Sequence, residues 1–490
     1  MHRLKSMHVT TEIKPGAERF SDMKLMRYFL FMMIASLGVI MASCIEDGFT
    51  TSPSDVLTFS RDTVDFDTVF TDLGTPTARL IVRNRASKSI NISSIRFQNP
   101  QSAFSMNVDG MSGIEFHDVE IRAKDSIYVF IECFIPETQG ASPGLVEDNL
   151  EFVTNGVTQT VKLEAYGQNV TRLRNFTVTE DMTLTARQPY VVFDSLTVAS
   201  GATLTIEPGA QLLFHDGASV KVDGTLKAVG SADSKIDMRG DRLDNVLPDV
   251  GYDILAGQWR GIRFSAASFD NRMEYVDMRS TVEGVVVDSC ADLSRQKLTL
   301  LNSWLHNSQG NVLQSKYAKV DAFGCCFSEA AASVVSLTGG VHQFLQCTIA
   351  NNYLFSAITG PLLWIGHAMP DDQYENEQPL MRAEFQNSIL YGLCDDLNIG
   401  DFTGADVFFR YVSLKSAGTD DDNFINCLWD TDPMFYTDRP IYYFNYRLQP
   451  DSPVKSAGNP AFIIPMVQYD MDGIDRLGHG NPSLGAYQWQ

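Results

Sequence analysis

Four short segments of the chain repeat one pattern, in which apolar residues flank small or polar ones. They are Leu301-Asn-Ser-Trp-Leu305, Phe323-Gly-Cys-Cys-Phe327, Leu345-Gln-Cys-Thr-Ile349 and Phe385-Gln-Asn-Ser-Ile389. The first three segments are equally spaced, and the last interval is nearly twice as long, so it holds one further repeat and an insertion. Self-similarity at a period of about 22 residues indicates a solenoid, in which each coil buries its apolar side by stacking on the next.

An earlier stretch shows how one coil is divided. Gly201, Gly209, Gly217 and Gly224 recur every seven or eight residues, and each follows or precedes a short strand such as Leu196-Thr-Val198. Three such strands make a coil of about 24 residues. We therefore predict a parallel β-helix over residues 168–490.

The aligned repeats also predict where some small side chains point. Ser303, Cys325, Cys347 and Asn387 share one position in the aligned segments. Each stands two residues before an apolar residue, as Ser303 stands before Leu305, and therefore lies on the same face of its strand. We expect them to form an inward-facing ladder, because successive strand residues point to opposite faces. The eight cysteines of this large chain are predicted to be mostly free, buried thiols, since disulfide scaffolds are typical of small chains.

Residues 57–167 show a different pattern, with short runs that alternate apolar and polar side chains, such as Ile90–Phe97 and Thr158–Ala165. Turn residues separate the runs, and Asn155-Gly156 is the strongest hairpin signal. No run has the period of a helix. About seven strands in this length predict a β-sandwich, and no cluster of ionisable residues there indicates chemistry.

Residues 1–43 are predicted to be a leader. Lys24 and Arg27 precede the almost wholly apolar stretch Tyr28–Ser43, which is shorter than the roughly 20 residues of a membrane-spanning helix. Acidic residues earlier in the chain are unusual for a leader, so Met23 is the predicted start.

Met41-Ala-Ser-Cys44 resembles the bacterial lipobox, which implies a lipoprotein signal peptide cut before Cys44 and lipid on that cysteine. Residues 44–56 would then form a lipid-anchored tether of small polar residues. Two acids at Glu46 and Asp47 are similar to a signal that some diderm bacteria use for surface export. We expect an outer-membrane lipoprotein that faces the cell exterior and touches the membrane through its lipid.

The charge of the remaining body excludes one class of partner. Residues 1–43 hold six basic and three acidic side chains, which leaves 32 basic against 57 acidic ones and a net charge of −25. Such a body repels the phosphates of nucleic acid. We predict no nucleic-acid partner.

Two later stretches carry a family resemblance. Gly257-Gln-Trp-Arg-Gly-Ile-Arg-Phe264, followed by Met273–Met278, resembles consecutive coils of the bacterial right-handed β-helix repeat family, which shares the fold of pectate lyases. The end of the chain, from Tyr446 to Tyr487, is similar to the terminal segment of those proteins. Residues 57–167 resemble the immunoglobulin-like domain of many surface lipoproteins.

These resemblances imply an all-β chain, with an immunoglobulin-like β-sandwich followed by a right-handed parallel β-helix and a C-terminal cap. They identify a fold and not an activity.

No motif marks an active site. The nearest catalytic candidates lie in or beside the insertion Pro361–Pro379, and polar residues there are more often solvated surface: His367, Asp371, Asp372 and Arg382. We predict no bound metal or other cofactor, and leave calcium open because lyases of the resembled fold use it. Its nearest ligand candidates are Asp395, Asp396, Asp470, Asp472 and Asp475.

Two functions remain. The first is a non-catalytic surface lipoprotein whose β-helix binds a glycan or another surface protein, with Trp364, Tyr374 and Tyr391 as aromatic residues that could stack on sugar rings. The alternative is a carbohydrate-active enzyme, a polysaccharide lyase or glycoside hydrolase acting on acidic polysaccharide. A groove with convergent carboxylates beside an Arg or Lys would favour the enzyme.

Overall fold

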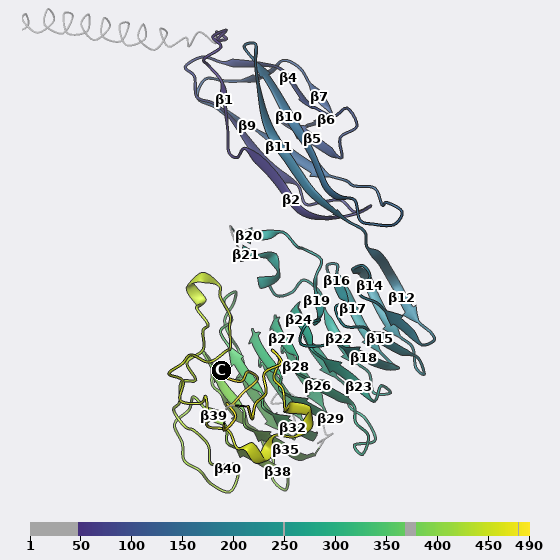
Figure 1. Cartoon of the computed structure of the whole chain (residues 1–490), viewed down its shortest axis with the longest axis vertical. Helices are drawn as coiled ribbons and strands as arrows, with labels where there is room; N and C mark the ends of the chain where they lie inside the picture. Colours follow the sequence, from purple (N-terminus) through teal and green to yellow (C-terminus); the bar gives the residue numbers. More distant parts are fainter. Residues whose placement is uncertain (1–47, 248–249, 368–378, 479) are drawn as a thin grey trace, which may run out of the picture. The chain divides into compact units, whose positions relative to one another are not determined.

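The computed structural model describes residues 48–247, 250–367, 379–478 and 480–490, and this part contains strands and four short 3-10 helices but no α-helix. The described residues form two compact units (Figure 1). One comprises the chain up to Val64 with Thr77–Ile131 and Asp148–Leu163, and the other comprises Asp65–Pro76, Glu132–Glu147 and Glu164–Gln490. Cys44 and the predicted leader lie outside the described residues.

The N-terminal strands form two sheets. The first has the order β1 (Leu57–Phe59), β3 (Ala78–Asn84), β9 (Ser126–Cys133), β5 (Phe104–Val108), β6 (Met111–Gly113). The second has the order β2 (Thr63–Phe70), β11 (Val157–Gln168), β10 (Gly144–Thr154), β4 (Ile90–Phe97), β7 (Glu115–Phe116), with β8 (Val119–Ile121) beside β4. Strand β3 pairs antiparallel with β1 and β9, and β4 pairs antiparallel with β10.

The period-two pattern explains how these sheets pack. In β9 the apolar Ile127, Val129 and Ile131 are buried, while Tyr128 and Phe130 between them are exposed. The rings of Phe59 and Phe152, one from each sheet, lie 4.9 Å apart. Asn155-Gly156 forms the turn between β10 and β11, and both residues have positive φ as a type I′ hairpin requires.

The rest of the chain winds into coils whose strands stack in three parallel rows (Figure 1), an arrangement consistent with a β-helix. Strands β12 (Thr171–Val178) and β14 (Tyr190–Val198) begin both the first and the second row. The first row continues through β16 (Gln211–Phe214), β19 (Ile236–Gly240), β24 (Val276–Thr281), β27 (Trp304–Ser308), β30 (Cys326–Ala330), β33 (Thr348–Asn351), β36 (Ile389–Gly392) and β39 (Ser413–Leu414).

The second and third rows complete each coil. The second comprises β17 (Ser219–Val222), β22 (Gly261–Phe264), β25 (Val285–Val287), β28 (Leu313–Lys316), β31 (Val335–Thr338), β34 (Leu363–Gly366) and β37 (Leu397–Ile399). The third comprises β13 (Met182–Leu184), β15 (Thr203–Ile206), β18 (Thr225–Val229), β23 (Asn271–Glu274), β26 (Leu298–Leu301), β29 (Lys319–Phe323), β32 (Gly340–Leu345), β35 (Leu380–Gln386), β38 (Asp406–Arg410) and β40 (Phe424–Ile425).

The structure confirms the repeat and corrects its last step. Leu301, Phe323 and Leu345 stand in register at the predicted, equal spacing. Leu345 then pairs with Gln386 and not with Phe385. The register of the last repeat is therefore displaced by a single position from the predicted alignment.

A shift of one residue turns a strand over, because side chains alternate between faces. Ser388, not Asn387, therefore continues the inward ladder of Ser303, Cys325 and Cys347, and its hydroxyl accepts the backbone N–H of Cys347 at 3.1 Å. Asn387 instead occupies a left-handed corner with φ of 46° and bonds to Asn459. The prediction for Asn387 was wrong.

The interior of the coils is apolar and includes a stack of rings from the third row. Phe344, Phe385, Phe409 and Phe424 follow one another at centroid distances of 5.1, 4.8 and 4.7 Å. This spacing matches the separation of neighbouring strands. The seven described cysteines are all free thiols, five of them buried, as predicted.

The C-terminal segment 433–490 contains little regular structure beyond η2 (Arg439–Ile441), η3 (Pro460–Phe462) and η4 (Pro465–Val467). It packs along the outer side of the coils, where Val467 covers Leu301, Phe323 and Leu345. Arg476 is fully buried and donates to the backbone carbonyls of Gly485 and Ala486. In the described part of the chain, no helix has the length and apolar character needed to cross a membrane.

Candidate functional site

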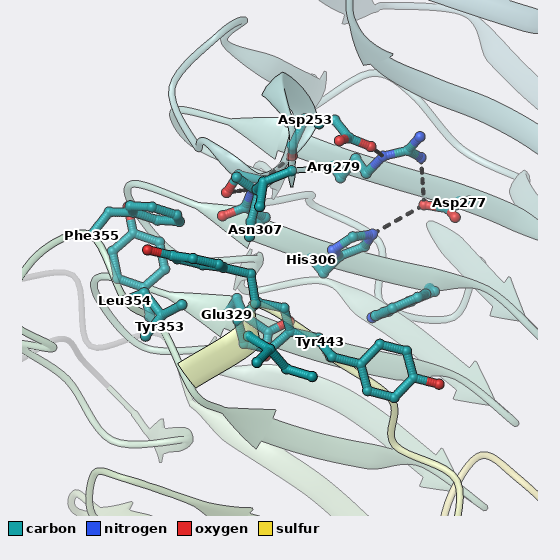
Figure 2. A pocket seen from close by; sticks show the side chains of 17 residues that line it. Asp253, Asp277, Arg279, His306, Asn307, Glu329, Tyr353, Leu354, Phe355 and Tyr443 are labelled. Atoms are coloured by element: carbon teal, nitrogen blue, oxygen red, sulfur yellow. Dashed lines mark hydrogen bonds and ion pairs between the residues drawn. The ribbon is translucent and has the colours of Figure 1, made fainter. Parts of the chain in front are cut away.

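A pocket of about 400 Å³ lies on the outer face of the first row (Figure 2). Its floor comes from β24, β27 and β30. Its walls come from three separate segments, which are Val250–Ile254 with η1 (Tyr252–Ile254), the loop Tyr353–Phe355 and the C-terminal stretch Ile441–Phe444. The first wall begins with β21 (Val250–Gly251), which pairs antiparallel with β20 (Asn245–Leu247).

Strand alternation places the charged floor residues. In β24 the buried Val276 and Met278 point into the coil, so Asp277 and Arg279 point outward. In β27 the inward Leu305 likewise leaves Trp304 and His306 on the outer face. Parallel stacking pairs Asp277 with Trp304 and Arg279 with His306, which brings all four side chains together.

Arg279 is the centre of an ion-pair network. It lies 2.7 Å from Asp237, 2.9 Å from Asp253 and 2.9 Å from Asp277, and Arg239 reaches Asp253 at 3.3 Å. Burial alone would lower the pKa of Arg279, but the three carboxylates outweigh it and raise that pKa. The charge of this guanidinium is therefore balanced by carboxylates of the protein itself.

Asp277 also holds His306. Its Oδ1 lies 3.1 Å from His306 Nε2 (Figure 2). The ring of His306 stacks on Trp304 at a centroid distance of 4.1 Å and an interplanar angle of 18°. Burial alone would raise the pKa of Asp277, but Arg279 and the His306 hydrogen bond hold it well below its usual range. Asp277 is thus a carboxylate that fixes the orientation of the imidazole.

Glu329 lies on the floor beside this network and is only 4% exposed. The hydroxyl of the buried Tyr446 donates to Glu329 Oε1, and Asn352 donates to that hydroxyl oxygen at 3.2 Å. Oε2 of Glu329 has no hydrogen-bond partner among the described residues. Burial raises the pKa of Glu329, although the hydrogen bonds to its carboxyl act in the opposite direction.

The walls of the pocket are aromatic and partly exposed. Phe355, Tyr442 and Tyr443 have exposed fractions of 42, 37 and 48%. Arg439 ties two of these walls together, because its guanidinium donates to the backbone carbonyls of Asn352 and Tyr353 at 3.0 and 3.1 Å. The site therefore combines exposed rings with a floor of carboxylates, which suits a ligand that has both apolar faces and hydroxyl groups.

Neither of the two catalytic candidates within the described residues, His367 and Arg382, lines this pocket. His367 bridges backbone groups, accepting from Leu380 N–H at 2.7 Å and lying 3.3 Å from Thr403 O. Arg382 forms an ion pair with Glu384 at 2.7 Å. Asp371 and Asp372 lie outside the described residues, as does the aromatic candidate Tyr374.

The other two aromatic candidates have packing roles. Trp364 is only 4% exposed. Tyr391 packs edge-on against Phe435 at 6.4 Å. Trp364 therefore presents no open face for a sugar ring, and Tyr391 is half-buried.

The acidic candidates for calcium bind protein groups. Asp396 accepts from Ser416 N–H and hydroxyl, while Asp470 accepts from the backbone N–H groups of Asp472, Ile474 and Gln488. Asp472 pairs with Arg447 at 2.6 Å, Asp475 accepts from Leu477 N–H, and Asp395 is exposed. Among the described residues, no three His, Cys, Asp or Glu side chains are grouped to hold a metal ion.

The pocket was missed because its residues come from segments as far apart in the chain as Val250 and Phe444. One signal was present in the repeats. Asp277 and Trp304 occupy the same outward position of consecutive coils, and a polar or aromatic residue there marks a surface rather than the core. The wall formed by Ile441–Phe444 lies outside the repeats, so no repeated pattern in the sequence marks those residues as part of the pocket.

Comparisons with known proteins name no family. No family model and no curated protein matches the chain. Among solved structures, a protein of unknown function from Porphyromonas gingivalis W83 is 12% identical over 25% of this chain and 59% of its own, with a TM-score of 0.18.

Two further structures match to a similar extent. A PapD-like domain of human CEP192 is 11% identical over 24% of this chain and 91% of its own, with a TM-score of 0.18. A family 123 glycoside hydrolase from Clostridium perfringens is 11% identical over 23% of this chain and 26% of its own, with a TM-score of 0.16. This chain therefore spans only part of the first and the last of these proteins, and all three similarities are too low to support a functional conclusion.

Proposed function

We propose that this chain is a glycan-binding lipoprotein of the outer membrane, anchored by lipid on Cys44 and facing the cell exterior. In this proposal the immunoglobulin-like sandwich is a spacer, and a right-handed, pectate-lyase-like β-helix presents the pocket to its ligand. The observation that supports it is the pairing of partly exposed rings at Phe355, Tyr442 and Tyr443 with a floor of carboxylates. Sugar rings stack on aromatic faces, and their hydroxyl groups donate to carboxylates.

The charge of the pocket favours a neutral sugar over a uronate. Arg279 is committed to Asp237, Asp253 and Asp277, and Arg239 to Asp253. Neither guanidinium is left to pair with a carboxylate of the ligand. Oδ2 of Asp277 accepts no hydrogen bond from the described residues and is available for a ligand hydroxyl.

Binding is tested with the purified mature chain and neutral chito-, xylo-, manno- and galacto-oligosaccharides, alongside oligogalacturonate, by isothermal titration calorimetry. Tyr443→Ala should weaken binding of a neutral oligosaccharide about 2- to 12-fold, since an aromatic stacking contact contributes about 0.5–1.5 kcal/mol. Tyr469→Ala is the matched control, because Tyr469 is 49% exposed but does not line the pocket. Preferential binding of oligogalacturonate, or equal loss in both variants, would contradict the proposal.

The anchor is tested separately. Cells fed a labelled fatty acid should label the wild-type chain and not a Cys44→Ser variant. Protease added to intact cells should remove the protein if it faces the exterior. Label that persists in the variant would refute the lipid assignment, and protection from protease would refute the surface orientation.

A further inference from the structure

The acidic side chains of this protein are distributed unequally between its two units. From residue 48 onward, the N-terminal unit holds nine basic and nine acidic side chains, whereas the coiled unit holds 23 basic and 46 acidic ones. The charge that repels anions therefore belongs to the coiled unit, and the N-terminal unit is neutral as a whole.

Several cations of the N-terminal unit gather around one hollow. This hollow of about 460 Å³ is lined by Arg83, Asn84, Arg85, Lys124, Asp125 and Ser126. Arg85 and Lys124 are exposed and Arg83 is half-buried, and none of the three forms an ion pair with another described residue. Of the lining residues only Asp125 is acidic, and its Oδ1 accepts the backbone N–H of Ser126 at 2.8 Å. The lining therefore has an excess of two positive charges.

Hydrogen bonds hold the cations of this hollow together. Strands β3 and β9 pair antiparallel, so the loop after β3 and the loop before β9 lie at the same end of the sheet. The first loop carries Arg85 and the second carries Lys124, whose Nζ donates to the backbone carbonyl of Arg85. The buried side chain of Asn84 joins the same two loops, because its Nδ2 donates to Lys88 O at 2.8 Å and to Arg122 O at 3.0 Å.

The described chain also begins at this end. Phe49 forms a bridge with Ser89, which belongs to the loop that carries Arg85, and the backbone N–H of Thr50 donates to Ser89 O at 2.9 Å. Cys44 lies five positions before Phe49. Because an extended chain spans at most about 3.6 Å per residue, a lipid on Cys44 would hold this end within about 18 Å of the membrane surface.

We propose that this end of the N-terminal unit is a membrane-docking surface, on which Arg83, Arg85 and Lys124 bind the phosphate groups of anionic phospholipids. The proposal rests on the proposed lipid anchor at Cys44 and adds a second contact with the same membrane. Guanidinium and ammonium groups donate charge-assisted hydrogen bonds to phosphate oxygens. Phe49 is 49% exposed at this end, and aromatic rings are enriched at the level of the headgroups.

The second contact gives the N-terminal unit a defined orientation. Lipid on a flexible tether leaves a domain free to turn, whereas a surface that binds headgroups restricts that rotation. Glu46 and Asp47 of the tether are repelled by an anionic surface, and the exposed Lys88 and Arg122 in the same two loops offset them. The three cations of the hollow then remain to attract the membrane.

The test uses the purified mature chain carrying one myristoyl group, joined to the amino-terminal Cys44 by native chemical ligation, which spares internal cysteines. A single acyl chain binds membranes only marginally, with an association constant of about 10⁴ M⁻¹, so a further contribution is measurable. Sedimentation compares vesicles of phosphatidylcholine with vesicles that contain one-third phosphatidylglycerol, at about 0.1 M NaCl, where charges more than about 10 Å apart are screened. The wild type should prefer the phosphatidylglycerol vesicles.

A pair of double variants locates the effect. Arg85→Gln with Lys124→Gln should weaken binding to phosphatidylglycerol vesicles about 10- to 30-fold, because each cation near an anionic membrane contributes about fivefold. Binding to phosphatidylcholine should not change. Arg187→Gln with Lys316→Gln is the matched control, since both residues are exposed cations of the coiled unit and the change in net charge is the same. Equal losses in the two double variants, or a wild type without a preference, would overturn the docking surface.

Salt provides a second test that needs no variant. The screening length falls to about 3 Å at 1 M ionic strength, so the preference for phosphatidylglycerol should disappear there while binding through the acyl chain remains. A preference that persists would contradict recognition by exposed cations.

The synthetic acyl chain separates this inference from the proposed function. If Cys44 takes up no fatty-acid label in cells, the anchor is refuted and the docking surface loses its premise. If Cys44 is labelled but the ligated chain shows no preference between the two kinds of vesicle, the docking surface alone is refuted. Glycan binding by the pocket is unaffected in either case.

Discussion

His342 should make the stability of the coiled unit depend on pH in a way that the sequence alone does not suggest. It lies in β32 with 1% of its surface exposed, and its Nε2 donates to Gly339 O at 2.7 Å. Its Nδ1 has no partner among the described residues. Burial lowers the pKa of His342 to about 4, so the native state holds the neutral ring.

The sign and size follow from proton linkage. The pKa of an unfolded histidine is about 6.5, so the unfolded state binds a proton first as the pH falls, and native stability drops below about pH 6.5 until about pH 4. Between pH 7 and pH 5 the loss from this one residue is about 2 kcal/mol. A His342→Gln variant keeps an N–H donor for Gly339 O and cannot gain that charge.

Urea denaturation at pH 7 and pH 5 measures the effect. All five tryptophans lie between residues 259 and 489, so their fluorescence reports on the coiled unit alone. The free energy of unfolding should fall by about 2 kcal/mol more in the wild type than in His342→Gln over this interval. Equal losses in the two proteins would refute the assignment of a neutral, buried His342.

Three further predictions concern other buried groups. Phe385→Ala should destabilise the coiled unit by about 3–5 kcal/mol, because it leaves a cavity between two stacked rings, and Phe385→Leu should cost less than half as much in the same urea assay. Cys325 and Cys347 should resist iodoacetamide in the native protein and react after denaturation, as mass spectrometry would show, because both are fully buried and burial raises the pKa of Cys325 to about 12. Labelling of either thiol in the native state would contradict their placement. Glu329→Gln should stabilise the protein relative to the wild type increasingly as the pH rises above about 4.3, the pKa of an unfolded glutamate, because the raised pKa of Glu329 means that native stability is lost as the pH rises toward and through it. A thermal midpoint difference that does not grow with pH would contradict the raised pKa of Glu329.

The N-terminal sheets and the coil period were readable from the sequence because both depend on local patterns. Period-two alternation and the Asn155-Gly156 turn specify neighbouring strands without reference to the rest of the chain. Each coil repeats the contacts of the coil before it, and the apolar residues at Leu301 and Phe323 therefore recur with it.

The register of the last repeat needed the tertiary structure. Apolar residues at Phe385 and Ile389 fit the alignment of the earlier repeats, yet Leu345 pairs with the next position along, Gln386. Leu390 consequently points into the coil, whereas Ile389 points outward to Leu448 and Val454 of the C-terminal segment. Both faces of this strand are buried, so hydrophobicity alone could not choose between the two registers.

By itself the sequence determined the class of structure, because stacking and alternation are short-range properties that repeat along the chain. Only the tertiary structure decided where chemistry could occur. Asp277, His306 and Glu329 come from three consecutive coils, and the walls above them come from Tyr353–Phe355 and Ile441–Phe444. A pocket assembled from such distant segments depends on how the chain returns along its own outer face, and no local pattern records that path.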